Sequence, residues 1–505
     1  QGSYIGGVYY PDRTRVGWWK NGYPEYFAKV LNAPNWIGID FNIEGESLDL
    51  FTAKKVIDFK RILDMRDGVY TRTFDVELNN GTIIRAEVHR FLSMEENEIG
   101  AIQYNIELLS DNAKIKVSPY ICGKVKNQDS NWDDPFWEHL IDYSVGKSAF
   151  LLSKTNKTNF NVCTYMHADL LLNGEEVSCR EEPFKDELKL GYNAEIELVK
   201  GDKLTLSKYG GYTVSLNHSE NKLKQVAEEK INFARAKGFV GLLKEHKQQW
   251  HTIWKMSDIV IKGDLSAQQG IRFNIFQLNQ TYTGKDSRLN IGPKGFTGEK
   301  YGGSAYWDTE AYCLPFYMVT KNANVARNLL KYRYDQLPKA IENAKKLGFE
   351  NGAALYPMVT MNGEECHNEW EITFEEIHRN GAIAYAIYNY VRFTGDQTYI
   401  PEMGFEVLLA IARFWRQRVN YSTQKEKYVI LGVTGPNEYE NNVDNNWYTN
   451  YIARWCLRYA AEQYKVLKAS HQNEFEEIFI KTSINNKEVK EWLSVADNFY
   501  LPYSE

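Results

Sequence analysis

The hydrophobic pattern of this chain changes its period once, near residue 220, and this change constrains the fold more than any other feature. Residues 82–92 alternate apolar and polar side chains, with Ile84 and Val88 on one face of an extended strand. Residues 101–110 alternate in the same way. Because strand follows strand without a helical crossover, the first two hundred residues predict an antiparallel β-sandwich rather than a βαβ fold.

After this point the apolar residues recur at helical spacing. Residues 221–256 predict a long connecting helix or a helix pair, with Phe239, Leu242 and Trp250 on the apolar stripe. Beyond residue 266 nearly every periodic segment is helical, and long loops rich in Gly, Asn and Glu separate the helices. The predicted helices are 267–282, 307–319, 324–346, 374–393, 405–418, 447–467 and 487–499. Loops this long are usually functional, so the chemistry is expected there.

The change of pattern predicts three segments. Residues 1–215 form the sandwich domain, which is expected to lack its first residues, because the chain opens at Gln1 rather than at Met. Residues 216–264 form a helical linker, and residues 265–505 form a helical domain.

The composition narrows the class of protein. The net charge is −6, from 60 Lys and Arg against 66 Asp and Glu, so a nucleic-acid-binding protein is disfavoured. The apolar stretches end before the about 20 residues that span a bilayer. Six dispersed cysteines without metal-ligand spacing favour reduced thiols in a cytoplasmic protein. Aromatic residues make up 14% of the chain, and rings beside carboxylates suit sugar binding.

Residues 301–310 form the first loop whose side chains could bind a ligand. Gly302 and Gly303 allow a ligand to approach the backbone closely, and Trp307 offers a flat face to a sugar ring. Asp308 offers two acceptor oxygens to neighbouring hydroxyls. The alternative is structural: Asp308 would cap a helix and Trp307 would fill the core.

The second loop, residues 362–376, is rich in carboxylates and contains one histidine and one tryptophan. His367 is not expected to bind a metal, because no second ligand follows it at helical spacing. Glu375 and Glu376 fall in the first turn of a predicted helix, where solvated carboxylates suit the helix dipole. We therefore interpret these two as surface residues.

The third loop, residues 433–447, cannot form a stable helix, because Gly435-Pro436 precedes a run of Asn and Glu. Such a loop can present one carboxylic acid in an aromatic setting formed by Tyr439 and Trp447. Desolvation there would raise the pKa of the acid and keep it protonated for general acid catalysis. A plain surface loop with Asn-rich turns is the alternative.

With these loops in view, the chain resembles the disaccharide phosphorylases of glycoside hydrolase family 65. The resemblance rests on residues Tyr306–Glu310, His367–Glu375 and Thr434–Glu440. It implies an α+β multidomain protein with an N-terminal antiparallel β-sandwich, a helical linker and an (α/α)₆-barrel catalytic domain. That barrel needs twelve helices, and about seven are predicted here, so we expect it to be incomplete at the C-terminus.

The resemblance also implies a reaction and its residues. It implies phosphorolysis of an α-glucobiose with inversion, with maltose expected before trehalose or kojibiose. Glu438 matches the general acid, and Trp307 and Asp308 match the pair that holds the non-reducing glucose. The loop with His367, Glu369 and Glu371 matches the segment that faces the leaving sugar, which makes these residues candidates for substrate binding.

The remaining expectations concern partners. The resemblance implies no cofactor, inorganic phosphate as co-substrate, phosphate-binding residues beyond Glu505, and a homodimer. The cysteine pattern, the net charge and the short apolar stretches predict a cytoplasmic protein that binds neither nucleic acid nor membrane. An inverting α-glucoside hydrolase is an alternative, although it needs a second carboxylate to activate water. A truncated sugar-binding protein without activity is the non-enzymatic alternative.

Overall fold

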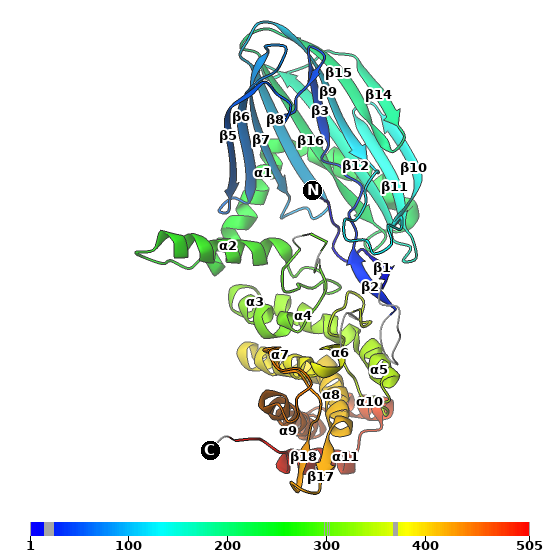
Figure 1. The fold of residues 1–505 in the computed structure, drawn as a ribbon. Coiled ribbons are helices and arrows are strands. Elements are labelled where there is room, and N and C mark those ends of the chain that lie inside the picture. Colours follow the sequence, from blue (N-terminus) through cyan, green and yellow to red (C-terminus); the bar gives the residue numbers. More distant parts are fainter. Residues whose placement is uncertain are drawn as a thin grey trace. The chain divides into compact units, whose positions relative to one another are not determined.

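The structure is a computed structural model that describes residues 2–14, 25–296, 298–299, 301, 303–366 and 372–503. The chain divides into two compact units, Gln1–Tyr10 with Leu31–Phe276 and Pro11–Val30 with Gln277–Glu505. Figure 1 shows that the first unit is built mainly of strands and the second mainly of helices. The predicted segment boundaries after residues 215 and 264 stay predictions.

Two antiparallel sheets form the first unit. Their strand orders are β10-β11-β12-β16-β8-β7-β6-β5, with β13 beside β12, and β14-β15-β9-β3-β4. The strands are β3 (Ile39–Ile43), β4 (Glu46–Ser47), β5 (Lys55–Asp64), β6 (Val69–Glu77), β7 (Ile83–Leu92), β8 (Ile99–Leu108), β9 (Ala113–Cys122), β10 (Trp137–Val145), β11 (Ser148–Thr155), β12 (Asn161–Leu172), β13 (Glu175–Glu176), β14 (Glu181–Asp186), β15 (Lys189–Leu198) and β16 (Lys203–Val214). A separate pair is β1 (Tyr9–Arg13) with β2 (Tyr26–Val30).

One hydrophobic core lies between these two sheets. Val76 and Ile106 of the larger sheet and Val117 and Tyr192 of the smaller sheet belong to a single buried cluster. In β7 the burial alternates along the strand, as its sequence predicts. The antiparallel sandwich predicted from the period-two pattern is therefore confirmed.

A 35-residue helix, α1 (Leu223–Ser257), follows the last strand of the sandwich. It is kinked at Gly238, whose φ of 66° and ψ of 169° are not helical. Its apolar side chains, among them Phe239 and Leu242, pack on Phe91 and Tyr209 of the larger sheet. The predicted helical linker is thus one kinked helix that covers a face of that sheet.

The second unit is a helical domain built around a large apolar core. Its helices begin with α2, which spans the division between the units. They are α2 (Leu265–Thr281), α3 (Leu314–Thr320), α4 (Ala323–Asp335), α5 (Leu337–Lys346), α6 (Ile372–Glu375), α7 (Arg379–Thr394), α8 (Phe405–Arg418), α9 (Trp447–Ser470), α10 (Gln472–Thr482) and α11 (Asn486–Asp497), with π-helical turns η2 (Thr309–Cys313) and η3 (Ile400–Gly404) and a hairpin of β17 (Asn420–Ser422) and β18 (Lys427–Val429).

Two of the predicted helices are broken in the structure. The segment 324–346 divides at Gln336, because Pro338 in the first turn of α5 has no N–H to continue the helix. The segment 374–393 divides after Glu375, and α7 begins at Arg379. The prediction also missed α10 and the β17–β18 hairpin. The predicted order of an antiparallel sandwich, a helical linker and a helical domain is confirmed.

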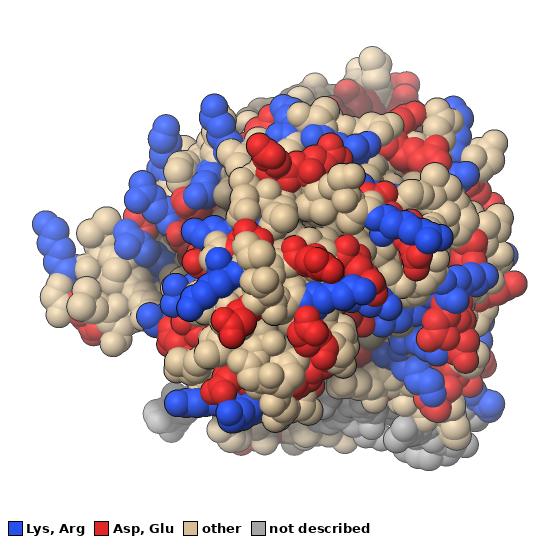
Figure 2. Space-filling model, turned by 90° about the horizontal axis from the view of Figure 1, so that it is seen from above, with Lys and Arg blue, Asp and Glu red and all other residues tan. Residues whose placement is uncertain are grey.

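The surface charge and the helices of the described residues can be compared with those of nucleic-acid-binding and membrane-spanning proteins. On the face seen in Figure 2, the described Lys and Arg side chains are interspersed with Asp and Glu. Among the helices of the described residues, none is long and apolar enough to cross a membrane.

Candidate active site

A buried ion pair fixes the segment that carries Trp307 and Asp308. Glu310, in the turn η2, accepts hydrogen bonds from the guanidinium of Arg333 on α4 at 2.7 and 3.0 Å. Arg333 also donates to the carbonyl of Tyr306 at 3.0 Å. Because Tyr306 precedes the Trp307–Asp308 pair and Glu310 follows it, one arginine anchors both sides of this dipeptide.

The half-buried Trp307 is held by aromatic neighbours. Its ring meets the ring of His378 edge-on, with centroids 5.0 Å apart and an interplanar angle of 87°. The His378 ring also contacts Tyr448, at 6.0 Å between centroids. Burial and the nearby charge of Arg379 lower the pKa of His378 to about 3. His378 is therefore neutral at pH 7 and acts as a packing support for the Trp307 ring.

Asp308 is half-buried beside this tryptophan and lies near a second carboxylate. Burial raises its pKa, and the charge of Glu438 raises it further. Glu438 belongs to a different loop, more than a hundred residues later in the chain. The fold thus brings together Trp307, Asp308 and Glu438, three residues predicted to belong to a sugar site.

The loop Val433–Val443, called the Glu438 loop below, is tied at its base. Val433 and Val443 exchange backbone hydrogen bonds of 2.9 and 2.8 Å. The carboxylate of Glu375 accepts hydrogen bonds from the Thr434 hydroxyl and from the backbone N–H of Asn442, the latter at 3.0 Å. Glu375 therefore fastens both strands of the loop base, and the interpretation of it as a solvated surface carboxylate was wrong.

The tip of the Glu438 loop differs from the expectation. Glu438 is exposed and adopts a left-handed conformation with φ of 55°. Tyr439 is 92% exposed, and Trp447, which is 45% exposed, stacks on Tyr451 at 4.9 Å. The predicted aromatic enclosure of the acid by Tyr439 and Trp447 is therefore wrong, because both rings turn to other surroundings.

Glu376 contradicts its interpretation as a surface residue. It lies in the break between α6 and α7 and is only 1% exposed. Burial raises its pKa to about 9, and the neighbouring carboxylate of Glu438 adds to this effect. The helix break turns Glu376 inward rather than leaving it in a solvated first turn, and it thereby joins the carboxyl groups of the candidate site.

The three remaining predicted site residues are His367, Glu369 and Glu371. They lie outside the described residues. Within the described ranges, no group of three or more His, Cys, Asp and Glu side chains could hold a metal ion.

The domains of one known family match almost the whole chain. The N-terminal domain of glycosyl hydrolase family 65 matches residues 1–253, and the central catalytic domain of that family matches residues 272–505. The chain belongs to glycoside hydrolase family 65.

Relatives in family 65 are similar over nearly the full chain. Maltose phosphorylase of Bacillus subtilis is 46% identical over 100% of the chain and 65% of the relative. Alpha,alpha-trehalose phosphorylase of Thermoanaerobacter brockii is 35% identical over the same shares. A solved structure named as a putative kojibiose phosphorylase from the human microbiome matches with a TM-score of 0.89 and 29% identity, covering 100% of this chain and 65% of the other. The chain thus spans about two thirds of the length of these family-65 proteins.

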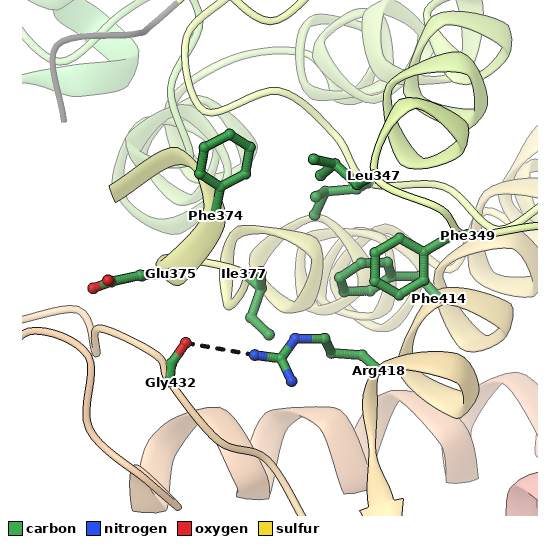
Figure 3. A pocket seen from close by; sticks show the side chains of 9 residues that line it. Leu347, Phe349, Phe374, Glu375, Ile377, Phe414, Arg418 and Gly432 are labelled. Atoms are coloured by element: carbon green, nitrogen blue, oxygen red, sulfur yellow. Dashed lines mark hydrogen bonds between the residues drawn. The ribbon is translucent and has the colours of Figure 1, made fainter. Parts of the chain in front are cut away.

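A cavity of about 350 Å³ lies beside the base of the Glu438 loop in this family-65 chain (Figure 3). Its wall is mostly apolar, and Arg418 at its rim donates to the carbonyl oxygens of Leu431 and Gly432. In Figure 3 the carboxylate of Glu375 points away from the apolar wall. Neither Trp307 nor Glu438 lines this cavity. The cavity is therefore lined by other residues than those of the candidate sugar site.

The burial of Glu376 has a signal in the sequence of this family-65 chain, in the helical spacing of the segment that follows it. Continuing this spacing backward from the buried Ile387 and Ile383 leads through Asn380 to Glu376. A glutamate on the apolar stripe of a helix is expected to be buried, whereas one on the polar face is expected to be solvated. No comparable signal marked His378, because its ring is positioned by Trp307 from a distant segment.

Proposed function

We propose that this protein is an inverting maltose phosphorylase, which converts maltose and inorganic phosphate into β-D-glucose 1-phosphate and D-glucose. The observation that carries the proposal is the 46% identity to a maltose phosphorylase over the whole chain. The meeting of Trp307, Asp308 and Glu438 in one site supports it. We also propose that the protein uses no cofactor and is a cytoplasmic homodimer.

In this proposal each residue has one task. Trp307, supported by His378, packs against a face of the non-reducing glucose, and Asp308 accepts hydrogen bonds from its hydroxyls. Glu438 protonates the glycosidic oxygen as the bond to the anomeric carbon breaks. Phosphate attacks that carbon from the opposite face, which inverts its configuration. Because phosphate is itself the nucleophile, no second carboxylate is required to activate water.

The phosphate dependence of maltose consumption tests the proposed function. The full-length enzyme that carries this chain is incubated with maltose, with and without phosphate, and the products are followed by NMR. We expect β-D-glucose 1-phosphate and glucose only when phosphate is present. Consumption at the same rate without phosphate would instead identify an inverting hydrolase. Binding of maltose without any product would favour the non-enzymatic alternative.

Asp308→Asn is expected to lower kcat/KM for maltose tenfold to a hundredfold. The substitution replaces a charged acceptor with an amide, and hydrogen bonds to charged groups contribute about 1.5–3 kcal/mol. The measurement is steady-state phosphorolysis. A matched control is Asp335→Asn, because Asp335 is a carboxylate at the protein surface paired with Lys331 on α4. Normal kinetics in a variant with both Asp308→Asn and Trp307→Ala would place the glucose elsewhere.

The loop containing His367, Glu369 and Glu371 is proposed to select the linkage of the disaccharide. Maltose, trehalose and kojibiose share the same non-reducing glucosyl group, so only groups facing the second sugar can distinguish them. A polar group left unpaired by the wrong isomer makes such discrimination large. We expect that replacing residues 367–375 with the loop of a trehalose phosphorylase changes the disaccharide formed from β-D-glucose 1-phosphate and glucose. An unchanged α-1,4 product, identified by NMR, would show that another segment sets the linkage.

A further inference from the structure

The exposure of Glu438 raises a question about the proposed acid step. A general acid must hold a proton at the pH where it works, and burial of a carboxyl group favours the protonated form. Since the aromatic residues of the loop do not enclose Glu438, some other group must keep a proton in the site.

The carboxyl group of Glu376 can hold a proton close to Glu438. Its side chain is buried, and neither oxygen makes a hydrogen bond of ordinary geometry to the part of the chain that the structure describes. The carboxyl groups of Glu438 and Asp308 both lie close enough to Glu376 to raise its pKa by their charge. A buried carboxyl group without a strong donor, next to two carboxylates, is stabilised in its protonated form.

Arg379 brings a positive charge close to Glu376, and two of its guanidinium nitrogens are hydrogen-bonded to backbone carbonyl groups. It donates to the carbonyl oxygen of Tyr356 at 2.6 Å and to the backbone carbonyl oxygen of Glu376 at 3.1 Å. It also lies 3.7 Å from the carboxylate of Glu365. The charge of Arg379 lowers the pKa of Glu376, but burial and the carboxyl of Glu438 raise it more.

The helix break also explains why the two carboxyl groups stay in register. Glu375 ties the base of the Glu438 loop through Thr434 and Asn442, and Glu376 is the next residue. The same two-residue segment thus holds the base of the loop with one carboxylate and faces its acid with the other. A movement of the loop relative to Glu376 would break the bonds of Glu375.

We propose that Glu376 is the proton partner of Glu438: the two carboxyl groups share one proton, which Glu438 delivers to the leaving oxygen. The inference rests on the proposed function. In the step, the bond between the anomeric carbon and the glycosidic oxygen breaks, and that oxygen takes the shared proton. Phosphate oxygen forms the new bond to carbon. Hydrogen phosphate loses its own proton, which returns to the carboxylate pair, so protons balance over one turnover. Glu376 is a positioning residue in this scheme, because it acts through Glu438.

A titration without substrate tests the pair directly. Carboxyl carbons are followed by NMR in the protein labelled with ¹³C-glutamate. In the wild type we expect one carboxyl that titrates near pH 9, matching the raised pKa of Glu376. This step should be absent in Glu376→Gln and should move down by about one pH unit or more in Glu438→Gln, because a neighbouring charge is removed.

A matched control separates pairing from simple burial. Glu364 also has a pKa raised by burial, but it lies on the polar loop and contacts Lys339 at 3.1 Å. Glu364→Gln should leave the step near pH 9 unchanged. If the step is also unchanged in Glu438→Gln, the two carboxyl groups do not share a proton and the proposal is overturned.

The pH dependence of turnover is the second measurement. In Glu376→Gln the alkaline limb of the kcat profile should move to lower pH by about one unit or more, while KM for maltose stays close to that of the wild type. An unmoved limb in a folded Glu376→Gln variant overturns the proposal and leaves the proposed function intact. Absence of phosphorolysis in the wild type instead overturns the proposed function, and the titration still reports on the pair.

Discussion

Under the proposed function, replacing Glu438 with Gln in the full-length enzyme is expected to lower kcat for maltose phosphorolysis by a factor on the order of 10² to 10⁴, with little change in maltose affinity. The amide keeps the shape of the side chain and most of its hydrogen bonding but cannot donate a proton to the glycosidic oxygen. Steady-state kinetics and calorimetric binding of maltose separate the two effects.

The neighbouring Glu440 provides the matched control for this prediction. It is an exposed carboxylate on the same loop, two residues away. Glu440→Gln should leave turnover nearly unchanged. Near-native turnover in Glu438→Gln, together with a large loss in Glu440→Gln, would transfer the role of the acid to Glu440.

Arg333→Met is expected to lower the free energy of unfolding by about 3–5 kcal/mol. The substitution leaves the Glu310 carboxylate buried without its partner, and both side chains are almost completely inaccessible to solvent. The measurement is equilibrium denaturation. Activity should fall as well, because Arg333 also holds the carbonyl of Tyr306, next to Trp307.

Two further variants show whether this loss comes from an unpaired buried charge. Arg458→Met removes an arginine from an exposed pair with Asp497 and should cost at most about 1 kcal/mol. Combining Arg333→Met with Glu310→Gln removes the unpaired charge and should recover part of the stability. A loss below about 1 kcal/mol in Arg333→Met alone would contradict the prediction.

The proposed proton pair assigns control of the protonation of Glu438 to a residue outside its own loop. Sequence reasoning placed the control of the acid within its own loop, in the rings of Tyr439 and Trp447. The structure instead places a buried carboxyl group, that of Glu376 in the α6–α7 break, close enough to Glu438 for the two charges to interact. In this scheme the pH range of the enzyme depends on Glu376, which acts through Glu438.

The local sequence pattern was sufficient to predict most of the helices and strands and part of the candidate site. The alternation along β7 and the helical spacing of α8 and α9 reflect which face of each segment is buried. This face can be identified from the order of apolar and polar residues in the sequence. The helix breaks at Gln336 and after Glu375 were missed. Pro338 was a visible local signal for the first break, whereas the second contains neither Gly nor Pro and is stabilised by contacts from the Glu438 loop.

The sequence by itself determined the order of a sandwich, a linker helix and a helical domain, and it identified Trp307, Asp308 and Glu438 as candidates. These are properties of short segments, whose periodicity and turn residues set local structure whatever lies nearby. Only the tertiary structure decided that Glu438 is exposed, that Glu376 is buried beside it and that Arg333 anchors the Trp307 segment. The ionisation of a carboxyl group depends on its desolvation and on neighbouring charges within a few ångströms. Those neighbours come from segments far apart in the chain, so only the folded protein brings them together.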